Sequence, residues 1–143
     1  MKNFLLFGSP LKDRGNSLAV LLLRVLAGVL MMTHGLQKLQ NFEAFSQGFM
    51  DPIGLGPKLS LILVMAAELG ASFFLLVGLL TRLSLMPLMF AMGVAFFIAH
   101  ANDPFQQKEL ALFYLGVYVV LFILGPGKYS LDNLLFGKFR KRN

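Results

Sequence analysis

Hydrophobic residues along the chain gather in four long blocks that short polar segments separate. The blocks cover about residues 17–37, 59–80, 83–100 and 109–125. A helix that spans the hydrocarbon core of a bilayer needs about 20 predominantly apolar residues, and each block approaches that length. Open sheets leave backbone groups unsatisfied in lipid, and uniform apolar runs lack the alternation of barrel strands. The pattern therefore predicts an all-α, polytopic membrane protein with a bundle of four transmembrane helices.

The segment between the first two blocks contains aromatic residues at helical spacing. Phe42, Phe45 and Phe49 recur every three or four positions, and the sequence DPIGLGP follows them. Aromatic side chains on one face of a short helix are typical of segments in the membrane interface, and Pro and Gly end such helices. The sequence therefore predicts a short interfacial helix over about residues 41–50.

The C-terminal tail, residues 126–143, is predicted to leave the membrane. The Gly-Pro-Gly sequence at 125–127 ends the fourth helix, and Ser130 is a candidate N-cap for a short amphipathic turn after it. The tail closes with the basic run KFRKRN, and basic residues near a bilayer surface favour anionic lipid head groups. Residues 1–143 are interpreted as a single membrane domain.

Composition supports this interpretation and indicates an orientation. Hydrophobic residues make up 57% of the 143 residues and charged residues 14%, whereas soluble domains are about a quarter charged. The net charge is +6, but the sequence contains no recognisable nucleic-acid-binding module, so we read the basic residues as orientation signals. Four spans put both termini on one side, which carries most Lys and Arg, while Lys38, Lys58 and Lys108 lie on the other. The positive-inside rule then predicts cytoplasmic termini. We expect a multi-pass protein of the plasma (inner) membrane of a prokaryote.

Two charged residues fall inside the predicted spans. Arg24 lies in the first block, and Glu68 lies near the centre of the second. A charge at the bilayer centre costs about 2.5–3.5 kcal/mol even on insertion scales, so we expect both side chains to face the bundle interior and to be paired. Glu68 is predicted to share a hydrogen-bonded network with the first helix, through Arg24 or His34. Such a network is either a structural latch or a functional group that binds a proton or ligand.

Further polar residues are predicted to gather at the outer end of the bundle. His34 and Lys38 lie near the end of the first helix, His100 ends the third, and Glu109 opens the fourth. They are candidates for a ligand-binding or polar network, and the alternative is that they are interfacial caps in contact with water. A metal site built from His34, His100 and Glu109, or haem ligation by the two histidines, is conceivable, but the pattern favours neither. The chain has no cysteine, which excludes disulfides and thiol chemistry.

Together these motifs resemble the DoxX family of small four-helix membrane proteins. The resemblance covers roughly residues 17–135 and is carried by His100 and by LRVLAGVLMMTHGLQKL (23–39), AELGASFFLLVGLLTRL (67–83) and GPGKYSLDNLL (125–135). The positions that match the polar and glycine residues of the family pattern are Arg24, His34, Gly35, Lys38, Glu68, Gly78, Arg82 and the turn at 125–127.

The resemblance implies the fold more firmly than the activity. The family is named after a subunit of an archaeal terminal quinol oxidase system, and members are linked to thiosulfate:quinone oxidoreduction and to oxidoreductase complexes that protect against oxidants. It therefore implies a redox-associated subunit or accessory protein that binds a quinone or similar amphipathic molecule beside oxidoreductase subunits. The alternatives are a carrier for a small solute or protons and a non-catalytic assembly partner of a membrane complex.

Overall fold

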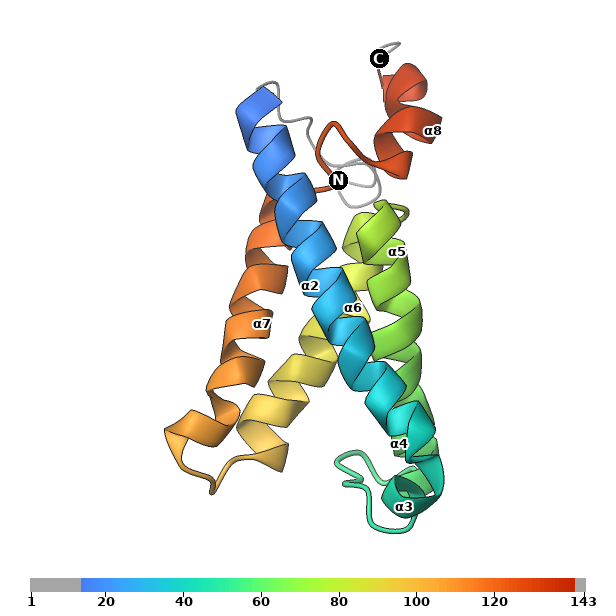
Figure 1. The fold of residues 1–143 in the computed structure, drawn as a ribbon, viewed down its shortest axis with the longest axis vertical. Coiled ribbons are helices and arrows are strands. Elements are labelled where there is room, and N and C mark those ends of the chain that lie inside the picture. The colour runs from blue at the N-terminus through green and yellow to red at the C-terminus, as the bar shows by residue number, and fades with distance from the viewer. Residues whose placement is uncertain (1–13, 141–143) are drawn as a thin grey trace.

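The computed structural model describes the chain from residue 14 to residue 140, with side chains to residue 136, and this part consists of helices and the loops that join them (Figure 1). Four helices are long and apolar enough to cross a membrane: Arg14–Gln40, Pro57–Val77, Thr81–Ala99 and Phe105–Leu124. The predicted all-α fold with four spans is therefore confirmed. The first span extends past the predicted block at both ends because its helix continues through polar residues that a hydropathy pattern excludes.

Two of the four spans combine α-helical and π-helical turns. The first span is α2 (Arg14–Gln40) and the fourth is α7 (Phe105–Leu124). The second span consists of α4 (Pro57–Met65), η1 (Ala66–Ala71) and α5 (Ser72–Val77), and the third of α6 (Thr81–Val94) and η2 (Ala95–Ala99). In the π-helical turns η1 and η2 each hydrogen bond spans five residues instead of four, a local feature that hydropathy does not reveal.

Two short helices lie outside the spans. The helix α3 (Phe42–Ser46) falls within the predicted interfacial segment and is shorter than predicted. The helix α8 (Leu131–Arg140) follows Ser130, whose Oγ accepts a hydrogen bond of 3.1 Å from the backbone N–H of Asn133. Ser130 is thus the N-cap that the sequence predicts.

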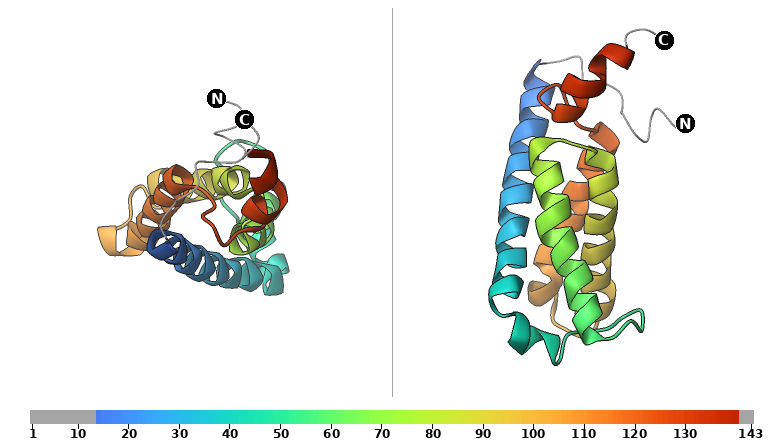
Figure 2. Two further views of the ribbon diagram at one scale, coloured as in Figure 1. Left: turned by 90° about the horizontal axis from the view of Figure 1, so that it is seen from above. Right: turned by 90° about the vertical axis from the view of Figure 1, so that its right-hand side faces the viewer.

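Close packing of α2 against the second span depends on two glycines. These helices lie side by side, as do α6 and α7 (Figure 2). A Cβ atom on Gly28 would lie 3.2 Å from the carbonyl oxygen of Ser72, and one on Gly35 would lie 2.7 Å from Cγ of Leu69. Only small residues permit this close approach of the two helices. The approach in turn decides which polar side chains of α2 and the second span come into contact.

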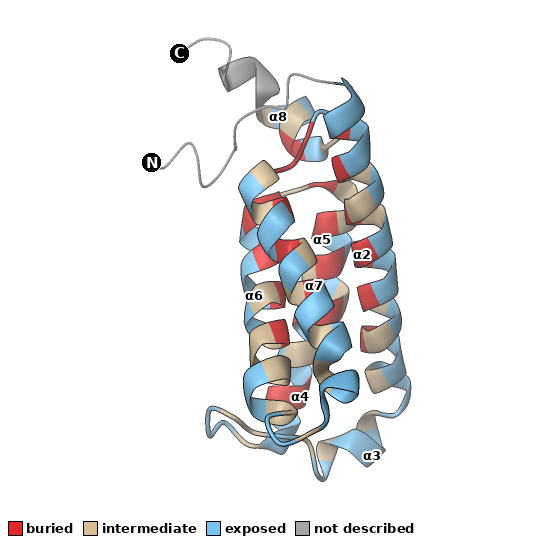
Figure 3. Ribbon diagram, turned by 90° about the vertical axis from the view of Figure 1, so that its left-hand side faces the viewer, coloured by how far each residue is buried: buried red, intermediate tan, exposed pale blue. Residues whose placement is uncertain are grey.

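Buried residues line the inside of the bundle, and exposed residues cover its outside (Figure 3). Met31, Leu75, Leu88 and Tyr118 belong to the buried core, to which all four spans contribute. Large hydrophobic side chains such as Phe113 are exposed on the outer surface. A surface of this kind suits contact with lipid, which is as apolar as the core.

The two ends of the bundle differ, and we name them after the short helices. The α8 end carries α8 and the start of α2, and the α3 end carries α3 and the loop after it (Figure 1). Four crossings bring the first and last described helices to the same end. The cytoplasmic location of the α8 end rests on the distribution of basic residues and stays a prediction.

Candidate functional site

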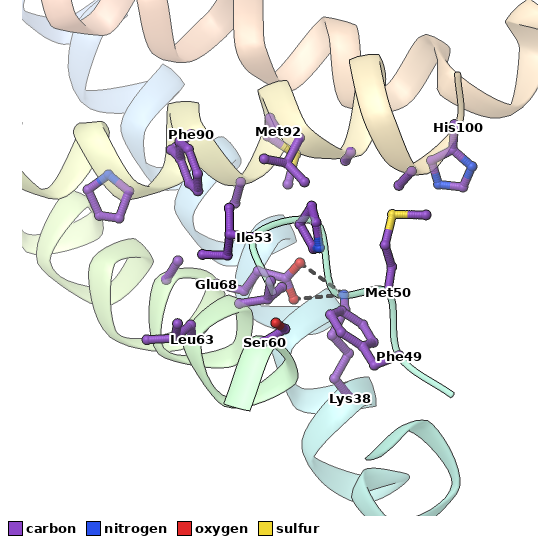
Figure 4. A pocket seen from close by; sticks show the side chains of 18 residues that line it. Lys38, Phe49, Met50, Ile53, Ser60, Leu63, Glu68, Phe90, Met92 and His100 are labelled. Carbon is purple, nitrogen blue, oxygen red and sulfur yellow. Dashed lines mark hydrogen bonds and ion pairs between the residues drawn. The ribbon is translucent and has the colours of Figure 1, made fainter. Parts of the chain in front are cut away.

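A cavity of about 450 Å³ lies at the α3 end, between the second and third spans (Figure 4). Side chains of α4, η1, α6 and η2 form its walls, and the loop after α3 contributes a further side. Its surface is mainly apolar, with a few polar side chains among the apolar ones. The lining residues are Lys38, Phe49, Met50, Pro52, Ile53, Ser60, Leu63, Val64, Ala67, Glu68, Pro87, Phe90, Ala91, Met92, Val94, Ala95, Ala99 and His100.

An ion pair between Lys38 and Glu68 forms part of the cavity wall. The Nζ atom of Lys38 donates to Oε1 of Glu68 at 2.9 Å and to Oε2 at 2.8 Å. The side chain of Glu68 is 4% exposed and that of Lys38 is 22% exposed. The carboxylate is thus buried and doubly hydrogen-bonded, whereas the ammonium keeps some access to its surroundings.

The predicted location of Glu68 is confirmed, but the predicted partner is wrong. Glu68 is buried and bonded to the first helix, through Lys38 instead of Arg24 or His34. The physical reason is the contact at Gly35, where a Cβ atom would lie 3.1 Å from the Cβ of Glu68. Lys38 lies within a turn of this contact, whereas Arg24 lies about 16 Å away along the helix axis.

Both π-helical turns of the spans border the cavity. Glu68 lies in η1, and Ala95 and Ala99 of η2 line the opposite wall. A turn with one extra residue shifts the side chains after it by about 100° around the helix, which changes the face that they occupy. Such turns are rare and frequently occur at functional sites. Their presence on two walls supports this cavity as the functional site.

The carboxylate of Asp51 holds the loop that covers the cavity. Its Oδ1 accepts hydrogen bonds from the backbone N–H of Leu55 and from Oγ of Ser60, each at 2.8 Å, and its Oδ2 accepts one from the N–H of Gly56 at 2.7 Å. These bonds, above all the one from Ser60, lower the pKa of Asp51 below its ordinary value. The sequence analysis missed this anchor, although an Asp directly before Pro and Gly residues is a common loop signal.

The polar residues that were predicted to gather at one end of the bundle do not form one cluster. His100 lines the cavity, and its Nδ1 lies 2.6 Å from Oδ2 of Asp103. The ring of His34 instead contacts the edge of the Tyr114 ring, with centroids 6.1 Å apart. Glu109 is exposed and is not a lining residue. Within the described residues, no group of three or more His, Cys, Asp or Glu side chains is placed to hold a metal ion.

Comparison with known proteins identifies the family. The DoxX family model matches residues 19–101, a stretch that includes the ion pair and His100. This chain belongs to the DoxX family.

Two relatives share most of the sequence of this DoxX-family protein. It is 33% identical over 129 residues to the inner membrane protein YqjF of Escherichia coli (strain K12), with 84% of this chain and 94% of that protein covered. It is 31% identical over 129 residues to an uncharacterized protein of Haemophilus influenzae, with 85% of both chains covered. No solved structure matches it. The family, the four apolar spans and the inner membrane relative show a multi-pass inner membrane protein.

Arg24 of this DoxX-family protein lies apart from the cavity, toward the α8 end. It is fully buried and donates hydrogen bonds to the backbone carbonyl oxygens of Leu75 and Leu76 at 3.1 Å each, and to those of Pro126 and Tyr129. The last carbonyl groups of a helix lack partners inside it, and the guanidinium supplies donors for them. Arg24 thus joins the end of α5 to the segment before α8, and the predicted contact with Glu68 is replaced by this role.

Asp132 also joins distant segments at the α8 end, and the sequence analysis did not predict this role. Its carboxylate accepts hydrogen bonds from the N–H groups of Leu80 at 2.7 Å and Thr81 at 2.9 Å. Its own N–H donates to the carbonyl oxygen of Gly78 at 2.8 Å. An acidic residue in the first turn after Ser130 is typical of a helix start, so the sequence could indicate where α8 begins. It could not indicate that Asp132 binds the distant hairpin between the second and third spans.

Proposed function

We propose that this DoxX-family protein binds a quinone in the cavity at the α3 end and serves as a quinone-linked, redox-associated subunit of the inner membrane. The observation that supports this proposal is a largely apolar cavity of about 450 Å³ with one buried ion pair on its wall. Sites for small molecules are typically clefts of about 300–1,000 Å³ in which a few polar groups fix the orientation of the ligand. A quinone has the matching chemistry, since it combines an apolar ring with two carbonyl acceptors.

The polar lining suits a ligand that brings acceptors. The ammonium of Lys38 has three N–H donors, of which Glu68 takes two, so one is left for a quinone carbonyl. Phe49 and Phe90 also line the cavity and provide aromatic surface against which a ring can pack. His100 adds an imidazole on the opposite side.

The cavity borders the outer surface of the bundle. Leu63 of the second span and Phe90 of the third both line the cavity, and both are exposed. Exposed apolar side chains on spanning helices contact lipid, so the opening between these spans admits a hydrophobic ligand from the bilayer. Since the chain has no cysteine, the electron donor or acceptor of the quinone would be a bound cofactor or a partner, and we place it in a partner subunit.

A single tryptophan gives a direct binding assay, because the chain contains none. Phe49→Trp places the reporter on the cavity wall. Titration of the purified protein with a short-chain ubiquinone analogue should quench its fluorescence saturably. Lys38→Met removes the donor and should weaken binding about tenfold or more, as expected for a lost charged hydrogen bond. Ala95→Phe fills the cavity and should weaken binding by at least as much.

The matched control carries the tryptophan on the lipid-facing surface of α7. Phe113→Trp is exposed and does not line the cavity, so quenching there should follow partition of the quinone into the micelle, without saturation. Identical unsaturable quenching at both positions, unchanged by Ala95→Phe, would refute the proposal. In that case the ion pair would be a latch between helices.

A further inference from the structure

Tyr129 and the first turns of α8 present an apolar face that nothing in the described structure covers. Tyr129, Leu131, Leu134 and Leu135 are all exposed, and Leu134 reaches 70%. We call these four residues the α8 apolar face. Leu131, Leu134 and Leu135 lie within an arc of about 100° around the helix, so they form one continuous strip. The exposed strip is distinct from the side of α8 that packs on the protein, where Asp132 is buried and Phe136 is half-buried.

The attachment of α8 fixes the direction of this face. Asp132 is bound through its carboxylate and its N–H to the hairpin between the second and third spans, at Gly78, Leu80 and Thr81. Asn133 also donates to the carbonyl oxygen of Lys128 at 3.0 Å, which holds the preceding turn. The side of α8 that carries Asp132 therefore points to the bundle, and the α8 apolar face points away from it.

The charge around α8 is strongly positive. Residues 126–143 contain five basic residues, Lys128, Lys138, Arg140, Lys141 and Arg142, and Asp132 is the one acid among them. Both oxygens of that acid accept backbone hydrogen bonds within the protein. Lys128, the basic residue of this segment whose side chain the structure describes, is exposed.

We propose that the α8 apolar face inserts into the head-group region of the bilayer, and that the basic residues of this segment bind anionic lipid head groups. Helices with one apolar face and flanking Lys and Arg lie in the plane of the interface and favour anionic lipid. The position supports lipid as the occupant, because α8 lies above the ends of α5 and α6 (Figures 1 and 2). Those helices expose Phe73 and Leu83, apolar side chains of the kind that contact lipid.

Selective quenching of a fluorophore on α8 tests this proposal in the full-length protein. The chain has no cysteine, so Leu134→Cys gives a single site for a bimane label at an exposed position. The protein is placed in nanodiscs that contain spin-labelled phosphatidylglycerol or spin-labelled phosphatidylcholine. Each basic residue near the surface favours anionic lipid about fivefold. We expect quenching at position 134 to favour phosphatidylglycerol at least about fivefold.

Two matched variants complete the test. Ile98→Cys places the label at an exposed position in η2, at the other end of the bundle and with no Lys or Arg adjacent in the sequence, and should show little preference between the two lipids. Replacement of Lys138, Arg140, Lys141 and Arg142 by Gln in the Leu134→Cys protein should abolish the preference and retain quenching by both lipids. Equal quenching by both lipids in the unaltered segment would overturn the proposal. Absence of quenching by either lipid would also overturn it, and would place the α8 apolar face in water or against a second protein.

Discussion

Lys38 and Glu68 differ in burial, and this difference predicts an asymmetric response to substitution. Lys38→Met leaves the carboxylate of Glu68, 4% exposed, without its partner. Loss of one member of a buried pair typically costs about 3–5 kcal/mol, since the remaining charge is desolvated and unpaired. Glu68→Gln leaves the ammonium of Lys38, which is 22% exposed and lies in the last turn of α2, at the α3 end. A lysine can extend along the helix surface to reach water, so we expect a smaller loss of about 1–2 kcal/mol.

The double variant separates a direct pair from two independent effects. In Lys38→Met with Glu68→Gln, neither full charge remains buried, so the loss should be smaller than the sum of the single losses by about 1–3 kcal/mol. Equilibrium unfolding in mixed micelles, followed by circular dichroism, gives the free energies of unfolding of the unaltered protein, the two single variants and the double variant. Lys58→Met is a suitable control, since Lys58 is exposed near the same end, and it should change stability by no more than about 0.5 kcal/mol.

Two results would contradict this reasoning. A larger loss for Glu68→Gln than for Lys38→Met would mean that the carboxylate is not the more strongly desolvated partner. Strictly additive losses would mean that the two side chains do not interact in the membrane environment, and that the cavity wall lacks the ion pair on which the quinone proposal depends.

Further predictions concern the loops at either end. Gly78→Ala should destabilise the protein more than Gly54→Ala, and thermal unfolding of the two variants measures the difference. Both glycines have left-handed φ values, of 72° and 73°, but only at position 78 would the added Cβ meet a neighbour, Nη2 of Arg24 at 2.6 Å. Because the pKa of Asp51 is lowered in the folded protein, its contribution to stability is present above the ordinary Asp pKa of about 3.9 and disappears as pH falls through the lower folded value. Unfolding measured from pH 7 down to pH 2 should therefore show a loss that is absent in Asp51→Asn, and equal acid sensitivity of both proteins would contradict this.

The spans were predictable because lipid imposes a simple rule on sequence. A segment that crosses the membrane has to be long and apolar, and the four blocks predicted the four spans. The Ser130 cap was also predictable, since its signal is local. By contrast, the π-helical turns η1 and η2 leave no trace in hydropathy, because they alter hydrogen bonding and leave composition unchanged.

The prediction about the partner of Glu68 rested on the positions of polar residues within the apolar blocks. Those positions favour Arg24 or His34, but contact also depends on how two helices approach and on the face that each presents. Gly35 fixes the approach, and η1 rotates the second span locally, so the carboxylate meets Lys38. A closer reading of the glycine would have indicated which turn of α2 touches the second span.

The partners of Arg24 show that a buried charge can be hydrogen-bonded by backbone groups instead of by a side chain of opposite charge. Its guanidinium has five N–H donors in a plane, and the carbonyl groups at a helix end are acceptors with partial negative charge. Four such carbonyl oxygens surround it, from the end of α5 and from the segment before α8. A sequence pattern can indicate a carboxylate partner, but backbone carbonyl groups occur at every residue, so the pattern does not indicate which of them Arg24 binds.

The positions of these two networks suggest a division of roles along the bundle. At the α8 end, Arg24 and Asp132 bind backbone groups of distant segments and leave the hairpin and α8 fastened together. At the α3 end, the polar pair lies on the wall of a cavity, and the covering loop is held by Asp51 at its own base. Binding sites are drawn from the less densely tied parts of a fold, since a ligand has to enter and leave. The proposed ligand therefore belongs at the α3 end, where the bundle is open, while the α8 end keeps the helices in register.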